Sequence, residues 1–130
     1  MGRKRIVRQG DVFMCDLSVD AIDNEQNGIR PVLVISVDAR NETSHNVFIF
    51  PITHAQKKVQ PCHHVLLNSD YPFFTYPRQV VLCEEGRSVS KKRLERFLGR
   101  ITEEDIGSIL KCKEYVFVDK DKNAIETWGK

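Results

Sequence analysis

Residues 27–36, which read NGIRPVLVIS, join a turn to an apolar run. The Asn-Gly dipeptide at the start is typical of tight turns because both residues tolerate positive φ. Pro31 lacks an amide donor and favours an extended backbone for Arg30. The apolar run therefore predicts a strand over residues 31–37, buried on both faces, with Arg30 at its mouth. A cation at the rim of a small core is a candidate site residue, although a solvated Arg after a turn gives the same pattern.

Length and composition describe an ordinary globular chain. Its 130 residues suffice for one self-sufficient core, and 41% hydrophobic with 29% charged residues is typical of globular proteins. A formal net charge of +2 neither indicates nor excludes nucleic-acid binding. We find no repeat or linker, and we expect one domain over residues 1–118. Residues 119–130 form a charged tail, which could dock through Ile125 and Trp128.

Targeting and redox signals favour the cytoplasm. No apolar run approaches the ~20 residues that a membrane helix needs. No apolar segment follows the basic N-terminus as it would in a secretory signal. The four cysteines show no C-x-x-C spacing, so free thiols in a reducing compartment are expected. We therefore expect a cytoplasmic protein without membrane partners.

Short apolar segments separated by polar connections occupy the first ninety residues. No helical period separates them, which predicts a mainly β fold with a small, strongly curved antiparallel sheet or barrel. The expected strands are residues 12–17, 31–37, 47–50, 64–67, 79–83 and a short sixth at 88–89. The expected connections are residues 18–28, 38–46, 54–61 and 68–77.

After residue 89 the period changes to that of helices. Ser90 is a candidate N-cap for a first helix, and Gly99 is its expected end. Thr102 is the candidate cap of a second helix, which has acidic residues in its first turn and reaches about Tyr115, with residues 116–118 helical or extended. The expected buried stripes are Leu94, Phe97 and Leu98 in the first helix and Ile106, Ile109 and Leu110 in the second.

Several kinds of chemistry can be set aside from spacing. Cys62, His63 and His64 with Cys83 suggest zinc, but consecutive residues of an extended chain alternate faces and cannot all meet one metal. There is no nucleophile elbow, no G-x-x-x-x-G-K-[ST] and no G-x-G-x-x-G. We expect neither a metal nor a cofactor.

Polar residues at strand ends form the remaining candidate site. Arg30 opens the second expected strand, Thr53 and His54 close the third, and residues 84–87 follow the fifth. If these ends converge, two guanidiniums, a hydroxyl and an imidazole would suit a phosphodiester. The 2′-hydroxyl of RNA can attack the adjacent phosphorus without a metal, while the protein moves two protons and stabilises the phosphorane. Because free guanidinium is a poor base, Arg30 suits charge stabilisation and proton donation. The base is open between His54 and Glu84, and charged strand ends also occur without function.

Five blocks in register resemble the MazF/PemK (Kid) toxins of type II toxin–antitoxin systems. They span residues 7–118 in the family's order and spacing. The blocks are RQGD at 8–11, EQNGIRPVLVI at 25–35, Ile52-Thr53, Val80–Leu82 with Glu84 and Arg87, and residues 90–94. The resemblance implies a homodimer of small SH3-like β-barrels, each with five to seven strands and two or three short helices.

The resemblance also implies an mRNA interferase. Such a metal-independent endoribonuclease cleaves single-stranded RNA at short motifs and leaves 2′,3′-cyclic phosphate and 5′-hydroxyl ends. Arg30 and Thr53 take the positions of the family's catalytic pair. A cognate antitoxin is the implied protein partner, and it would cover the groove with an extended, partly acidic segment. The residues expected to bind RNA are Glu25, Gln26, Ser36, Asp38, His54, Lys57, Glu84, Glu85 and Arg87.

Departures from the family pattern bear on the cleavage motif. Ser36-Val37-Asp38 stands where many members have Gln-Asn-Asp, and Glu85 stands where a Gln is common and would repel phosphate. The aromatic residues of the 68–77 connection could stack on bases or pack in a core or dimer contact.

Two rival functions remain. A non-catalytic module that binds RNA or protein would leave RNA intact. A gyrase poison of the related fold would inhibit gyrase even after Arg30→Ala.

Overall fold

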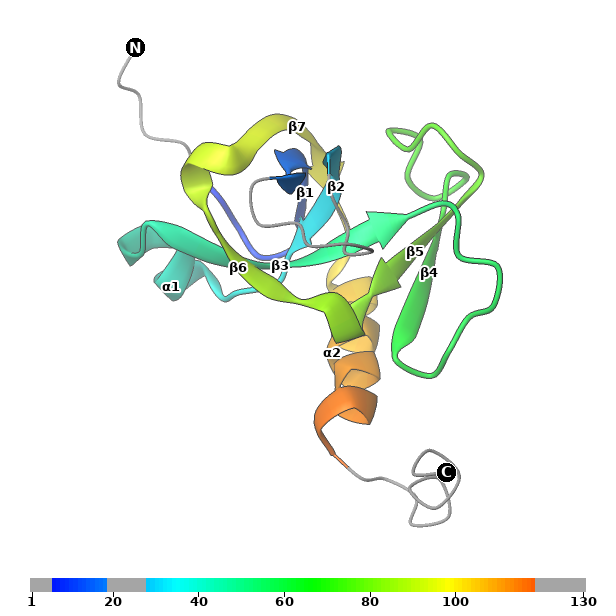
Figure 1. Ribbon diagram of the computed structural model, residues 1–130. Coiled ribbons are helices and arrows are strands. Elements are labelled where there is room, and N and C mark those ends of the chain that lie inside the picture. Colours follow the sequence, from blue (N-terminus) through cyan, green and yellow to red (C-terminus); the bar gives the residue numbers. More distant parts are fainter. Residues whose placement is uncertain (1–5, 19–27, 119–130) are drawn as a thin grey trace.

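A curled antiparallel sheet forms most of the computed structural model, which describes residues 6–18 and 28–118 (Figure 1). Its strand order is β4-β5-β3-β2-β1-β7, and β6 pairs with β3. Every described strand pairing is antiparallel, which confirms the predicted mainly β class. The strands are β1 (Asp11–Asp16), β2 (Ile29–Val34), β3 (Asn46–Thr53), β4 (His63–Leu67), β5 (Arg78–Leu82), β6 (Arg87–Ser90) and β7 (Leu94–Arg100).

Strand β3 links the two halves of the sheet. Near its start it pairs with β6, with Val47 opposite Val89, and near its end it pairs with β5, with Thr53 opposite Val80. On its other edge β3 pairs with β2, with Val32 opposite Pro51. The C-terminal end of β3 therefore lies between the start of β2 and the start of β5.

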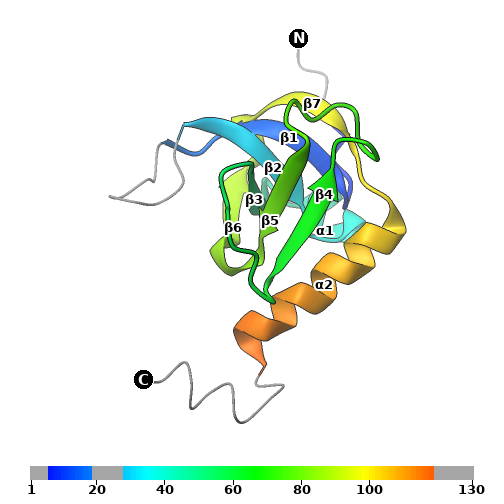
Figure 2. The same ribbon diagram turned by 90° about the vertical axis from the view of Figure 1, so that its right-hand side faces the viewer.

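The two faces of the sheet bury two apolar clusters. Side chains alternate along β3, so Phe50 and Ile52 lie in one cluster while Val47 and Ile49 lie in the other. Helix α2 (Glu103–Phe117) packs beside β4 and covers the cluster that contains Phe50 (Figure 2).

Helix α2 begins at the predicted cap. The Thr102 side chain accepts a hydrogen bond from the Asp105 N–H at 3.1 Å. Ile106 and Ile109 are buried as the stripe predicts, and the helix continues through Tyr115 to Phe117. Over residues 6–18 and 28–118, no helix is long and apolar enough to cross a membrane.

The prediction of a helix between Ser90 and Gly99 is wrong. Ser90 caps only the 3-10 turn η3 (Lys91–Arg93), by accepting the Lys92 N–H at 3.2 Å. The chain then continues as β7, which pairs with β1. Without β7, one edge of β1 would be left unpaired. The hydrogen bonds between β7 and β1 therefore outweigh the helical spacing of the three apolar residues in this segment.

Gly99 does not end a helix; instead it allows close packing of an aromatic ring against β7. A Cβ atom at Gly99 would lie 2.4 Å from the ring of Phe73, so the missing side chain admits this aromatic ring against β7. The 68–77 connection is thereby seated on the sheet.

Residues 38–46, predicted as a polar connection, contain the short helix α1 (Asp38–Thr43). Asn41 is buried and donates from Nδ2 to the Ser36 carbonyl at 2.8 Å. The Ser36 hydroxyl bonds to the Asn41 amide oxygen and accepts the Phe48 N–H at 3.0 Å. These tertiary contacts stabilise a turn of helix that has no side-chain cap and no apolar period.

Candidate active site

The ends of β2 and β3 bring Arg30 and Thr53 to neighbouring positions. Val32 pairs with Pro51, and extending this register by two residues on each strand sets Arg30 opposite Thr53. Thr53 is 6% exposed, and its Oγ1 accepts the Ala55 N–H at 3.1 Å. Arg30 is half-buried at the mouth of β2, as the turn and Pro31 predict. These two strand ends therefore converge.

A pocket of about 230 Å³ opens beside Arg30. Two guanidiniums line it, from Arg30 in β2 and Arg96 in β7, so the pocket suits an anion. The aromatic 68–77 connection and the start of β5 also contribute to its lining. The other lining residues are Met14, Ile29, Pro31, Ile52, His54, Phe73, Phe74, Thr75, Tyr76, Gln79 and Leu98.

The imidazole of His54 is stacked on the ring of Tyr76. The ring centroids are 3.7 Å apart and the planes differ by 8°. Because β3 ends at Thr53, His54 is the first residue beyond the strand, and the stack holds its exposed ring beside the pocket. An imidazole so held is available to exchange a proton with a bound ligand.

Glu84, the other candidate for the general base, is not among the residues that line the pocket. It lies in the 3-10 turn η2 (Cys83–Glu85), and its Oε2 is 2.8 Å from the buried His63 Nε2. Glu85 follows in the same turn, and Arg87 pairs with Ile49 at the start of β6. Arg30, Thr53 and His54 therefore lie at converging strand ends, as expected, but of these three only Arg30 and His54 line the pocket. Residues 84–87 also lie outside its lining.

The remaining expected RNA-binding residues are spread over other parts of the chain. The Asp38 Oδ1 accepts the Gln9 N–H at 2.7 Å, and the Ser36 hydroxyl is held by Asn41 and Phe48. Lys57 is exposed in the connection after β3. Glu25 and Gln26 lie outside the described residues.

Cys62, His63 and Glu84 have potential metal ligand atoms within 4.8 Å of one another. The His63 Nδ1 accepts the Gln60 N–H at 2.9 Å, so Nδ1 carries no proton and Nε2–H donates to Glu84. A metal on Nε2 would need a proton on Nδ1, where it would face the Gln60 N–H. The hydrogen bonds of His63 therefore do not fit a metal ligand.

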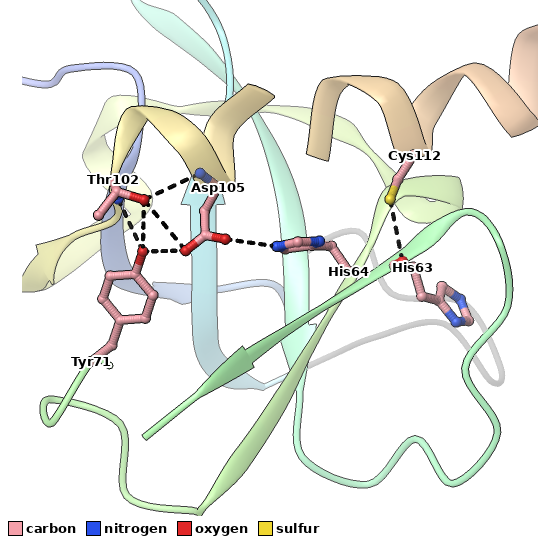
Figure 3. Close-up of polar contacts among 6 residues, drawn as sticks. All are labelled: His63, His64, Tyr71, Thr102, Asp105 and Cys112. Carbon is pink, nitrogen blue, oxygen red and sulfur yellow. Dashed lines mark hydrogen bonds and ion pairs between the residues drawn. The ribbon is translucent and has the colours of Figure 1, made fainter. Parts of the chain in front are cut away.

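His64 points away from His63 and joins a network that fixes the start of α2 (Figure 3). Its Nε2 is 3.0 Å from the Asp105 Oδ1, and the Tyr71 hydroxyl donates to the other oxygen of Asp105. The Thr102 N–H donates to the Tyr71 hydroxyl at 3.0 Å. Burial raises the pKa of Asp105, but hydrogen bonds from Tyr71 and His64 outweigh it and leave the pKa below its ordinary value. Burial raises the pKa of Tyr71. This network anchors the connection that carries the pocket's aromatic wall.

Arg96 and Gln79 line the pocket but were not among the expected site residues. The sequence predicts a helix at Arg96, and only the pairing of β7 with β1 brings it to the pocket that Arg30 also lines. Gln79 does carry a signal in the sequence, because it is an uncharged polar residue in an apolar strand.

The fold and pocket define a small antiparallel β protein with a cationic, aromatic-lined site. Residues 8–117 match the family described as PemK-like, MazF-like toxin of type II toxin-antitoxin system. This chain is 38% identical over 91 residues to Endoribonuclease EndoA of Bacillus subtilis (strain 168), covering 68% of this chain and 75% of that protein. It is 34% identical over 99 residues to Endoribonuclease MazF of Staphylococcus epidermidis, covering 75% and 80%. The chain therefore belongs to the PemK-like, MazF-like toxins, as the resemblance predicted.

Solved structures share the fold. MazF (Form-I) from Deinococcus radiodurans superposes with a TM-score of 0.72 at 20% identity, covering 88% of this chain and 98% of that one. An endoribonuclease in complex with its cognate antitoxin from a mycobacterial species gives a TM-score of 0.70 at 22% identity, covering 88% and 99%.

Proposed function

We propose that this chain is a cytoplasmic toxin endoribonuclease, an mRNA interferase that cleaves single-stranded RNA at a short motif without a metal. The observation that carries the proposal is the register of β2 and β3, which sets Thr53 opposite Arg30. Arg30 lines a pocket together with a second guanidinium and an imidazole. Family membership and the names of the two curated relatives, both endoribonucleases, support it.

The reaction uses a nucleophile that RNA itself supplies. The 2′-oxygen attacks the adjacent phosphorus, a P–O2′ bond forms, and the P–O5′ bond breaks. The products are a 2′,3′-cyclic phosphate and a 5′-hydroxyl. Arg30 donates paired hydrogen bonds to the non-bridging oxygens, where charge grows in the phosphorane. The Thr53 oxygen already accepts the Ala55 N–H, so its own O–H remains to donate to a phosphate oxygen.

Two proton transfers complete the step. The 2′-hydroxyl loses a proton, and the departing 5′-oxygen gains one. Of the two base candidates, His54 lines the pocket while Glu84 is hydrogen-bonded to His63, so we assign the base to His54. Arg30 is the assigned donor to the 5′-oxygen, in addition to stabilising charge.

The partners follow from the same surface. The guanidiniums of Arg30 and Arg96 suit an acidic, extended segment of a cognate antitoxin, which would exclude RNA by occupying the pocket. A structural neighbour was solved in complex with its cognate antitoxin. We also propose that the toxin is a homodimer, that its domain spans residues 1–118, and that residues 119–130 are a tail.

The test is incubation of the purified protein, free of antitoxin, with a long single-stranded RNA in excess EDTA. We expect discrete fragments with cyclic-phosphate ends, and losses of at least about 100-fold in rate for Arg30→Ala and Thr53→Val. Arg40→Ala, on the exposed surface of α1, is the matched control and should retain activity. RNA that binds but stays intact would favour the non-catalytic module, and gyrase inhibition unaffected by Arg30→Ala would favour the gyrase poison.

A further inference from the structure

We propose that Gln79 selects the nucleobase that enters the pocket, by accepting a hydrogen bond from an amino group of the base next to the scissile phosphate. The inference rests on the proposed RNA-cleaving function and assigns part of its sequence specificity to one side chain.

The first observation is an unsatisfied amide. Gln79 lies on β5, between β4 and β3, and is 3% exposed. Its Oε1 is buried and has no hydrogen-bond partner, and among residues 6–18 and 28–118 it is the one buried side-chain nitrogen or oxygen without a partner. Buried amide oxygens are nearly always paired in folded proteins. An unpaired amide oxygen on a residue that lines a pocket is explained by a ligand that supplies the missing donor when the amide turns toward it.

The second observation is where the strand register sets this amide. Thr53 pairs with Val80, so the next step along the antiparallel register sets Gln79 opposite His54. Gln79 and His54 both line the pocket that Arg30 and Arg96 also line. The unsatisfied oxygen therefore belongs to a side chain that lines the same pocket as Arg30, Arg96 and His54.

The shape of the pocket suits a planar ring. Phe73 and Phe74 form its apolar wall, with ring centroids 4.7 Å apart, and the His54–Tyr76 stack offers a flat aromatic surface beside them. Aromatic side chains bind splayed-out bases of single-stranded RNA by stacking. Gln79 would then meet the polar edge of a base held by these rings.

The hydrogen-bonding capacity of the Gln79 Oε1 atom determines which ligand groups it can bind. A carbonyl oxygen only accepts hydrogen bonds, so it cannot bind a phosphate oxygen, whereas both guanidiniums can. The exocyclic amino groups of adenine, cytosine and guanine are donors that project from the ring, and a Gln amide can recognise such an edge with its oxygen and nitrogen together. The pocket is thus divided between guanidiniums for the phosphate and an amide for the base.

The test begins with the cleavage motif of the wild-type protein. Oligoribonucleotides are then made in which one amino group at a time is replaced by hydrogen, for example adenosine by purine riboside and guanosine by inosine. At one position next to the cleaved bond, we expect wild-type kcat/KM to fall by about 10- to 100-fold. Gln79→Met keeps the side-chain length without the amide, and should cleave both oligonucleotides at the same reduced rate. Gln60→Met, an exposed Gln outside the pocket, should behave like the wild type.

A measurement of thermal stability distinguishes a base-recognising role of Gln79 from a purely structural one. Because Gln79→Met removes a buried unpaired oxygen, we expect its Tm to equal or exceed that of the wild type, whereas a structural amide would lower Tm when lost. If Met does not fit, Gln79→Leu is the second variant. Wild-type cleavage that is indifferent to every amino group, or unchanged discrimination in Gln79→Met, overturns the inference.

A binding measurement tests base recognition by Gln79 separately from the proposed RNA cleavage. Oligonucleotides with a 2′-deoxy sugar at the cleaved position cannot react, and their affinity is measured by fluorescence anisotropy. Loss of affinity on amino-group removal in the wild type, but not in Gln79→Met, supports base reading even if no RNA is cleaved. Cleavage together with equal affinity for both members of each pair overturns base reading and leaves the nuclease intact.

Discussion

His54 and Tyr76 stack face to face, with ring centroids 3.7 Å apart, and the stack joins the end of β3 to the connection that precedes β5. This contact fixes the imidazole at the pocket without burying it. A base must be held within reach of the proton that it removes, and a flexible segment after a strand would not do so unaided.

The stack yields a prediction about pairs of variants. His54→Ala should reduce kcat by about 100- to 10,000-fold, because the proton acceptor is lost. Tyr76→Phe keeps the stacking surface and should retain most activity. Tyr76→Ala should lower kcat by about tenfold or more, because the imidazole of His54 is no longer held in place. Single-turnover cleavage measures all three, with His45→Ala as the control on another exposed histidine. Full activity in His54→Ala would return the role of base to Glu84.

Arg96 should act mainly in binding. It contributes a second cation to the pocket from β7. We expect Arg96→Ala to raise KM for RNA by about tenfold with a smaller effect on kcat, and to reduce the salt dependence of binding by about one phosphate contact. Affinity measured over a series of salt concentrations gives this slope. An unchanged slope and KM would exclude Arg96 from the RNA path.

Gly99 and Gly107 form a matched pair for testing how the aromatic wall is seated. A Cβ at Gly99 would meet the Phe73 ring at 2.4 Å, whereas a Cβ at Gly107 on α2 meets nothing within 4 Å. Gly99→Ala should therefore lower the free energy of unfolding by about 1 to 3 kcal/mol. Gly107→Ala should raise it by up to about 1 kcal/mol, because Ala has the higher helix propensity. Urea denaturation measures both, and equal effects would contradict the close packing.

Asp105 gives a pH-dependent prediction for stability. Burial raises its pKa, but hydrogen bonds from Tyr71 and His64 outweigh burial and hold it below the ordinary value of 3.8. A group whose folded pKa is depressed stabilises the fold above its unfolded pKa, and this contribution disappears as the pH falls through the folded pKa. Asp105→Asn should therefore cost about 1 to 3 kcal/mol at pH 7 and progressively less below about pH 4. Urea denaturation across this pH range tests it, and a cost that does not change with pH would contradict it.

The sequence predicted the parts of the site that local rules determine. A turn dipeptide, Pro31 and an apolar run suffice to set Arg30 at the start of a buried strand, and the end of the next strand sets Thr53 and His54 beside it. The cap and buried stripe of α2 are likewise local, and both are confirmed.

The parts that were missed depend on partners distant in sequence. Residues 94–100 have helical spacing, but they form β7 because the edge of β1, some eighty residues earlier, offers a strand ladder. Arg96 could not be assigned to the pocket without that pairing. Gln79 is recognisable in the sequence as a polar residue in an apolar strand, but only the folded structure reveals that its oxygen is unpaired and that the residue lines a pocket.

The central claim is that RNA's own 2′-hydroxyl is the nucleophile, and a single-atom change in the substrate tests it most directly. An oligoribonucleotide that contains the mapped motif is compared with one in which only the nucleotide 5′ to the cleaved bond is 2′-deoxy, both in excess EDTA. The account predicts cleavage of the first to a 2′,3′-cyclic phosphate and no cleavage of the second, with binding retained. Cleavage of the 2′-deoxy oligonucleotide at the same bond would show that water or a protein group is the nucleophile, and would contradict the mechanism assigned to Arg30, Thr53 and His54.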